Sequence, residues 1–282
     1  MNVVHHFGPR LVLAAFSLFV ASPSSLAITL YQTGFEAPVF STGSLVGQDG
    51  WGGFGDLIGD TAANVMSVGA SEGSNAVRVK SSEWGQDGPF AIYAPTPLNF
   101  DPLAMGTPMV RLSADIRLDG PQTGPPIDGD FISANLVTRI GPGGQGGIFS
   151  LILSSDSNAY AFGSRGAAES YLFQTPAALG KYHSLAMQLD FAAGTTSYFL
   201  DDQIMGTLSF RTDVPTNFFR RGNLAFQGVD SSFAYDPTAY TAYFDRYQVT
   251  AVPEPTTISL FAFGLMVICA GWRRTMRTPS MR

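Results

Sequence analysis

Very few side chains in this sequence have the chemistry of a nucleophile or a catalytic base. The one cysteine, Cys269, lies in an apolar run near the C-terminus, and His183 is the only histidine beyond the N-terminal segment. A serine triad needs a histidine as its base, and no nucleophile motif lies beside His183 in the sequence. Zinc sites of the histidine or cysteine type lack ligands. We therefore expect His183 to pack within a strand and expect no covalent or zinc catalysis.

Carboxylates are the remaining chemical groups, because glycoside hydrolysis needs only two of them about 5–10 Å apart. Between residues 28 and 252, no glutamate has another carboxylate two residues away, the spacing that would place both on one face of a strand. The glutamates there are Glu36, Glu72, Glu83 and Glu169. The local pattern gives no support to a hydrolase, although a pair assembled from distant strands stays open.

Two tryptophans lie in segments rich in glycine and acidic residues. Trp51 lies in Asp-Gly-Trp-Gly-Gly and Trp84 in Glu-Trp-Gly-Gln-Asp. Tryptophans on loops can stack on the faces of sugar rings, and they also often fill the core beneath a loop. Both residues are therefore candidates for glycan binding, with core packing as the alternative.

The elements that must position these residues are short strands. In residues 110–118, apolar side chains at every second position alternate with Arg111, Ser113, Asp115 and Arg117, the pattern of a strand with one buried face. Further strands are expected at 29–36, 64–69, 75–80, 132–138, 148–154, 159–163, 185–189, 197–201, 223–228 and 242–249. Turns rich in glycine and proline separate them, and no helical pattern interrupts them. We predict an all-β protein, an antiparallel β-sandwich of the jelly-roll type.

The N-terminal segment, residues 1–27, has the order of a secretory signal peptide. A basic residue, Arg10, precedes ten apolar residues, and Ser25 and Ala27 are the small residues that signal peptidase requires. Ten apolar residues are too few for a spanning helix, which needs about 20. We predict export and cleavage by signal peptidase after Ala27.

The C-terminal segment, residues 253–282, has the pattern of a segment that stops in the membrane during export. Residues 256–272 carry no charge, and Arg273 and Arg274 follow at once. Arginines beside an apolar helix are retained on the cytoplasmic side. We predict a single transmembrane helix over 256–272 with a basic cytoplasmic tail, and one domain over residues 28–252 between the two ends.

The charge of that domain argues against one class of partner. The chain has 16 basic and 22 acidic residues, and those outside residues 28–252 are Arg10, Glu254, Arg273, Arg274, Arg277 and Arg282. The domain therefore holds 11 basic and 21 acidic residues, a net charge of −10. Such a surface repels phosphate backbones, so nucleic acid is not an expected partner.

The C-terminal order of motif, helix and arginines resembles the PEP-CTERM sorting signal of Gram-negative bacteria. Pro253, Glu254 and Pro255 supply the motif, and Arg273 and Arg274 supply the basic end. The resemblance implies recognition and cleavage near the motif by an exosortase in the inner membrane. It further implies passage from a membrane-tethered intermediate to the cell envelope, the outer surface or the extracellular matrix.

Residues 180–190 and 194–207 resemble the central hairpins of concanavalin A-like, or laminin G-like, jelly rolls. In carbohydrate-binding jelly rolls a structural calcium ion often joins the first and last strands. The resemblance implies that role for Glu36, expected to end the first strand, and Asp245, in the last. Carboxylates are ligands that calcium prefers. The alternative is a pair of solvated or hydrogen-bonded acids.

These expectations combine into one hypothesis. The protein is a non-catalytic, exported envelope or matrix protein that contacts extracellular polysaccharide through a lectin-like jelly roll, with one structural calcium ion. Two alternatives stay open on the same fold. One is a polysaccharide-degrading glycoside hydrolase, and the other is a purely structural or adhesive surface protein.

Overall fold

A computed structural model of the chain describes residues 27–54, 63–80, 90–122, 131–142, 147–165, 168–210, 215–229 and 239–253. The regular structure of these residues consists of β-strands, and none of them forms a helix that is long and apolar enough to cross a membrane. The predicted signal peptide, the predicted helix over 256–272 and Trp84 lie outside the described residues, as do Glu254, Pro255, Arg273 and Arg274.

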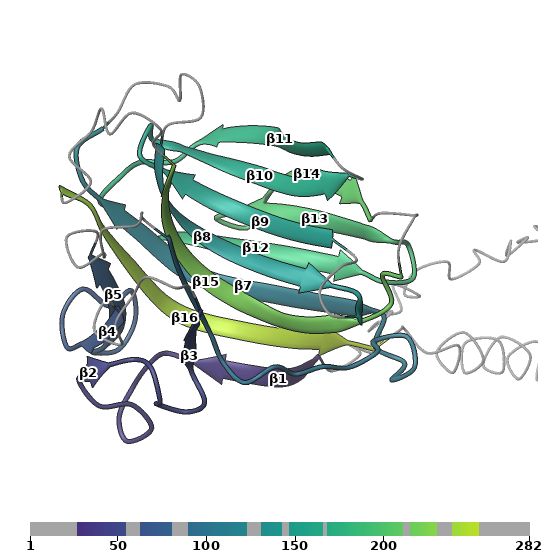
Figure 1. Ribbon diagram of the computed structural model, residues 1–282, viewed down its shortest axis with the longest axis horizontal. Coiled ribbons are helices and arrows are strands. Elements are labelled where there is room, and N and C mark those ends of the chain that lie inside the picture. Colours follow the sequence, from purple (N-terminus) through teal and green to yellow (C-terminus); the bar gives the residue numbers. More distant parts are fainter. Residues whose placement is uncertain are drawn as a thin grey trace, which may run out of the picture. The chain divides into compact units, whose positions relative to one another are not determined.

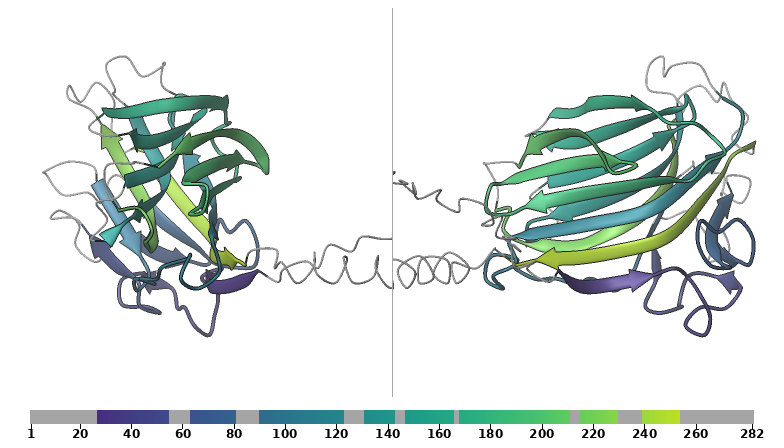
Figure 2. Two further views of the ribbon diagram at one scale, coloured as in Figure 1. Left: turned by 90° about the vertical axis from the view of Figure 1, so that its right-hand side faces the viewer. Right: turned by 180° about the vertical axis from the view of Figure 1, so that it is seen from behind.

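The strands form two antiparallel sheets, which lie as two layers in the left panel of Figure 2. Sheet A follows the order β14 (Gln203–Ser209), β13 (Thr195–Leu200), β12 (His183–Asp190), β7 (Met109–Asp119), β16 (Thr241–Val252), β5 (Ala76–Lys80), β4 (Ala63–Met66) and β2 (Gly43–Ser44), with β1 (Ile28–Thr33) also beside β16. Sheet B follows the order β11 (Ala168–Pro176), β10 (Asn158–Arg165), β9 (Gly147–Ser154), β8 (Phe131–Ile140), β15 (Phe219–Val229), β6 (Phe90–Ala94) and β3 (Gly52–Phe54). The predicted all-β sandwich is confirmed.

One continuous hydrophobic core fills the space between the sheets. The alternation in β7 places Val110, Leu112, Ala114, Ile116 and Leu118 in it, all of them fully or almost fully buried. The intervening side chains of β7 remain partly exposed on the outer face. Burial of apolar area at about 25 cal/mol per Å² therefore selects this register over a slip by one residue.

The last strand, β16, changes partners halfway along its length. It pairs with β7 on one side, while on the other side it pairs with β5 through residues 241–244 and with β1 through residues 247–251. A bulge between Asp245 and Gln248 marks the change. Figure 1 shows β1 in purple beside the yellow-green β16. Asp245 and Arg246 therefore lie where β16 passes from one neighbour to the other.

The first strand ends earlier than predicted. β1 ends at Thr33, so Glu36 lies in the following loop rather than at the end of the strand. Phe35 has a φ of 59°, which an extended strand cannot accommodate. The side chains of Phe35 and Phe244 are both buried in the hydrophobic core. The side chains of Glu36 and Asp245, which follow them in the sequence, are not part of that core.

Candidate functional site

Asp245 lies at the point in β16 where the strand passes from β5 to β1. The residue is 0 % exposed, and its Oδ2 accepts bonds from the Ser71 amide at 2.8 Å, the Ser71 hydroxyl at 3.0 Å and the Glu72 amide at 3.2 Å. Its Oδ1 accepts from the amide of Arg246 at 2.8 Å. Burial raises the pKa of Asp245, and these bonds oppose that rise. Asp245 therefore anchors the loop between β4 and β5.

Glu36 holds the other end of the same loop. Its Oε1 accepts from the amides of Ser74 at 2.7 Å and Asn75 at 2.9 Å. Gly73 has a φ of +73°, and a Cβ there would lie 2.2 Å from Glu36 Oε1. A side chain at position 73 would therefore displace the carboxylate, so only glycine suits this close approach.

The two acids proposed as calcium ligands thus act as hydrogen-bond acceptors. The oxygens that accept these bonds face N–H donors, whose positive ends would repel a cation placed there. Among the described residues, no three histidine, cysteine, aspartate or glutamate side chains form a group that could hold a metal ion. The N–H donors around Glu36 and Asp245 fit a pair of acids that holds the loop between β4 and β5 in place, named the clamp below, better than they fit a calcium site.

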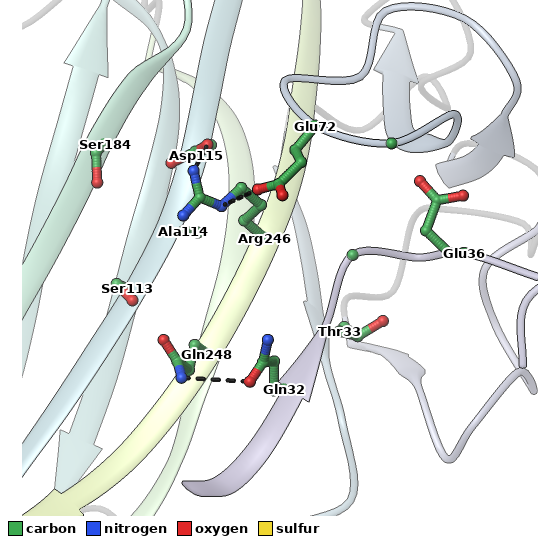
Figure 3. Close-up of a pocket in the computed structure, with 12 residues that line it drawn as sticks. Gln32, Thr33, Glu36, Glu72, Ser113, Ala114, Asp115, Ser184, Arg246 and Gln248 are labelled. Atoms are coloured by element: carbon green, nitrogen blue, oxygen red, sulfur yellow. Dashed lines mark hydrogen bonds and ion pairs between the residues drawn. The ribbon is translucent and has the colours of Figure 1, made fainter. Parts of the chain in front are cut away.

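Beside this clamp lies a polar pocket of about 510 Å³ on the outer face of sheet A. Figure 3 shows the Arg246 guanidinium in it, pointing toward Asp115 and Glu72. Arg246 Nε lies 3.1 Å from Glu72 and its Nη1 lies 3.5 Å from Asp115. A bond of 3.4 Å joins Gln248 and Gln32 across the same pocket. Arg246 is the one basic residue among the residues that line this pocket, against the carboxylates of Glu36, Glu72 and Asp115, and it pairs with the last two in a structural ion-pair network.

The clamped loop reads Gly69-Ala-Ser-Glu-Gly73, a Gly-x-Ser-x-Gly sequence. A nucleophile elbow joins a strand to a helix, whereas this loop joins the antiparallel strands β4 and β5. The Ser71 hydroxyl lies 2.7 Å from Asp115 Oδ2 and 3.0 Å from Asp245 Oδ2. A serine hydroxyl that donates to carboxylates has no imidazole base, so the motif has a structural role here.

His183 is held by two acceptors. Its Nδ1 lies 2.8 Å from Asp201 Oδ2 and its Nε2 lies 3.0 Å from the carbonyl oxygen of Ala178. The side chain is largely buried within β12, as the sequence predicts. Both ring nitrogens face acceptor oxygens of the protein itself, so neither is directed toward a substrate.

Trp51 lies in the core, the alternative that its sequence surroundings left open. It is 2 % exposed, and its ring packs 5.2 Å from Tyr247 and 5.4 Å from Phe35, measured between ring centroids. Its Nε1 donates to the Tyr31 hydroxyl at 2.8 Å. No ring face is left for a sugar, so Trp51 does not act as a glycan platform in this conformation.

The outer face of sheet B carries polar side chains that are buried although they point away from the core. On β9, β8 and β15, the core residues Leu151, Leu136 and Leu224 alternate with these polar residues, which therefore point to the other side of the sheet. The set, named the polar strip below, is Ser133, Asn135, Ser150, Ser154 and Asn223, none of them more than 5 % exposed.

The strand register gathers the members of the polar strip on one face, with Val137, Ile152 and Ala225 among them. Val137 on β8 lies opposite both Ser150 on β9 and Asn223 on β15. Ser133 lies opposite Ser154 at the other end. The members therefore occupy neighbouring positions on three adjacent strands, although they come from segments far apart in the sequence.

Four atoms of the polar strip lack a hydrogen-bond partner in the part of the chain that the structure describes. They are Asn135 Oδ1, Asn223 Oδ1, Ser150 Oγ and Ser154 Oγ. Buried polar atoms in folded proteins are almost always bonded, so such a group calls for a water or a ligand. Ser133 and Asn135, which alternate with apolar residues in 132–138, were the available sequence signal.

The surroundings of the polar strip are more open. Gln227, Tyr160 and Phe162 are partly exposed on the same face, and Arg139 is exposed. Tyr160 and Phe162, on β10, lie opposite Ile152 and Ser150 of β9. Two aromatic side chains therefore flank the strip on one side.

Comparison with known proteins adds two findings. Residues 251–274 match the PEP-CTERM protein-sorting motif. No curated protein matches the sequence.

Solved structures resemble the sandwich in fold. The alginate lyase Aly36B is 12% identical, with 82% of this chain and 97% of that one covered and a TM-score of 0.51. The carbohydrate-binding module CBM66 from Bacillus subtilis is 12% identical over 71% of this chain and 94% of that one, with a TM-score of 0.41. A sialidase is 12% identical over 71% of this chain but only 17% of its own length, with a TM-score of 0.42. The chain thus carries a PEP-CTERM protein-sorting motif, the mark of an exported protein, behind an all-β sandwich of the jelly-roll type.

Proposed function

We propose that an exosortase processes the tail of this protein and that its sandwich is a non-catalytic module contacting extracellular polysaccharide in a Gram-negative cell envelope. The sorting motif supports the first half of this proposal. The polar strip supports the second half, and its four unpartnered buried atoms are the observation that carries it.

Unpaired buried polar atoms cost about 1–3 kcal/mol each. A polysaccharide presents many hydroxyl groups, which both donate and accept. The four strip atoms are enclosed in this conformation. Polymer hydroxyls would bond them after the partly exposed side chains beside the strip move aside. The rings of Tyr160 and Phe162 beside the strip offer apolar surface of the kind that sugar faces contact.

A hydrolase would need two accessible carboxylates. In the described part of the chain, Glu36, Glu72 and Asp115 line one pocket, where Glu36 bonds two amides and Glu72 pairs with Arg246. Asp115 and Asp245 also lie together. They are cross-strand partners joined through Ser71. Asp245 is fully buried with both oxygens bonded, and Asp115 is paired with Arg246. Neither is placed to protonate a glycosidic oxygen. Reducing-sugar release that disappears in Asp115→Asn would instead establish the enzymatic alternative.

A retention assay tests the proposed function directly. The protein released from producing cells is passed over immobilised exopolysaccharide of the same cells, and bound protein is eluted with soluble polysaccharide. We expect retention that the soluble polymer competes away. Failure to bind this or any other glycan, combined with stable capture of defined envelope proteins, would replace the proposal with an adhesive role.

A further inference from the structure

The two ends of the sandwich meet in sheet A. Ile28, the first residue of β1, lies directly opposite Ala251, the residue before the last one of β16. Figure 1 shows the start of the purple β1 beside the end of the yellow-green β16. Neighbouring strands lie about 5 Å apart. The chain therefore enters the sandwich after the predicted signal peptide and leaves it toward the sorting tail at the same end of sheet A.

The sorting motif begins inside the last strand. Its match covers residues 251–274, whereas β16 continues to Val252. Ala251 is 0 % exposed and is paired on both sides, with Ile28 of β1 and Val110 of β7. Val252 is still paired with β7. The first two residues of the matched segment are therefore strand residues of the folded sheet.

No linker separates the sandwich from the Pro-Glu-Pro sequence. Pro253 directly follows Val252, and a proline has no N–H group with which to continue a paired strand. A protease acts on a chain that is open to its active site, so residues held in a sheet must first separate from their neighbours. Cleavage within this end of β16 would therefore require release from β7 and, at Ala251, from β1 as well.

We infer that sheet A sets the limit of processing: the exosortase cleaves on the C-terminal side of Val252, and the pairing of the end of β16 slows that cleavage. This inference rests on the proposed exosortase processing and adds the position of the cut and a control of its rate. Cleavage breaks one peptide bond, with the acyl group on the domain side passing to water and the new amine remaining on the tail. The released sandwich keeps β16 complete, so β1 keeps its partner strand.

The experiment moves the motif away from the sheet. About six glycine and serine residues, which span up to about 20 Å, are inserted between Val252 and Pro253 of the full-length protein. This insertion leaves the sequences of β16 and of the Pro-Glu-Pro motif unchanged. The matched control carries the same insertion between Ala192 and Ala193, two exposed residues of the turn between β12 and β13.

Both variants and the wild type are made in the producing cells and in the same cells without their exosortase. Pulse-chase labelling measures the rate of tail removal, and mass spectrometry identifies the C-terminal residue of the released protein. We expect the insertion before Pro253 to raise the rate at least roughly fivefold, because the rate follows the population in which the segment is open. The control should be processed at the wild-type rate, and the released wild type should retain Val252.

Two results would overturn the inference while leaving exosortase processing in place. The first is a rate that the insertion before Pro253 leaves unchanged, or that the control insertion raises equally. The second is a released wild-type protein that ends before Val252, since the exosortase would then open β16 itself. Tail removal that continues unchanged without the exosortase, or that does not occur in any of the cells, would remove both the proposed processing and this inference.

Discussion

At the scale of single residues, the hydrogen-bond partners of each polar side chain determine whether that side chain is available for chemistry. The side chains that look most like catalysts in the sequence are all engaged. His183 is held by two acceptors, Ser71 by two carboxylates and Asp245 by the loop between β4 and β5. Among the described residues, four buried atoms without a partner lie in the polar strip, and Thr196 Oγ1 on β13 is another, outside it.

Asp245 predicts a pH dependence of a definite sign. Because burial raises its pKa in the folded state, the folded protein holds this proton more tightly than the unfolded chain does. The stability from this proton is fully present below the unfolded pKa, about 4, and is lost as pH rises through the folded value. Asp245→Asn, a neutral side chain of the same shape, should lack this contribution.

Urea denaturation of both proteins between pH 4 and neutrality measures this effect, with the range set by the ordinary aspartate pKa of about 4. We expect the unfolding free energy of the wild type to fall relative to that of Asp245→Asn as pH rises. A difference that stays constant, or that moves in favour of the wild type, would show that the bonds from the loop outweigh burial.

The effect of replacing Trp51 distinguishes a role in core packing from a role in glycan binding. Truncation to alanine removes a buried ring and leaves the Tyr31 hydroxyl without its donor. We expect Trp51→Ala to destabilise the protein by about 3–5 kcal/mol, the usual cost of deleting a buried aromatic side chain. Thermal or chemical unfolding checks this. Unchanged stability with weaker polysaccharide binding would return Trp51 to the role of a sugar platform.

At the scale of elements, the central feature is the clamp on the loop between β4 and β5. On the side opposite β7, β16 has no neighbouring strand where it passes from β5 to β1. At this point Glu36 and Asp245 accept bonds from the amides of the loop. Carboxylates thus accept the bonds from backbone N–H groups that a neighbouring strand would accept in a regular sheet. The clamp replaces a missing stretch of sheet.

The clamp predicts stability without metal. Glu36→Ala should cost about 1–3 kcal/mol, because two amide donors lose their acceptor. Glu72→Ala should cost less, because it removes an exposed ion pair with Arg246 and keeps the bond from the Glu72 amide to Asp245. Calcium should leave the melting temperature of the wild type unchanged. A rise in melting temperature with calcium that disappears in Glu36→Ala would show instead that the two acids bind the ion.

Strands with one apolar face were predictable, and those without one were not. Residues 110–118, 132–138 and 185–189 alternate strictly and form the interior of β7, β8 and β12. β6 and β11 escaped prediction, since Phe90–Ala94 and Ala168–Pro176 show no clear period of two. Tertiary pairing with β15 and β10 defines them.

The candidate site could be predicted only in part for the same reason. A carboxylate near each end of the domain was visible in the sequence, but the donors that meet Glu36 and Asp245 come from a loop whose position depends on sheet topology. The polar strip joins residues of β8, β9 and β15 through register alone. No sequence spacing encodes that neighbourhood.

At the scale of the whole molecule, the two faces of the sandwich differ in character. The outer face of sheet A carries ion pairs that involve Arg111, Arg117 and Arg246. The outer face of sheet B combines the polar strip with the partly exposed Tyr160 and Phe162. A sorting motif follows the sandwich. An exported module that presents sheet B to extracellular polysaccharide accounts for this asymmetry.

Substitution within the polar strip tests this account most directly. Asn135→Leu and Asn223→Leu keep the number and branching of side-chain heavy atoms and remove atoms that are buried without a partner, while Gln188→Leu replaces an amide by leucine on the outer face of sheet A. We predict that both strip variants bind the exopolysaccharide of the producing cells about tenfold more weakly, with a melting temperature equal to or above that of the wild type. Unchanged binding in both variants, or a loss equal to that of Gln188→Leu, would contradict the account.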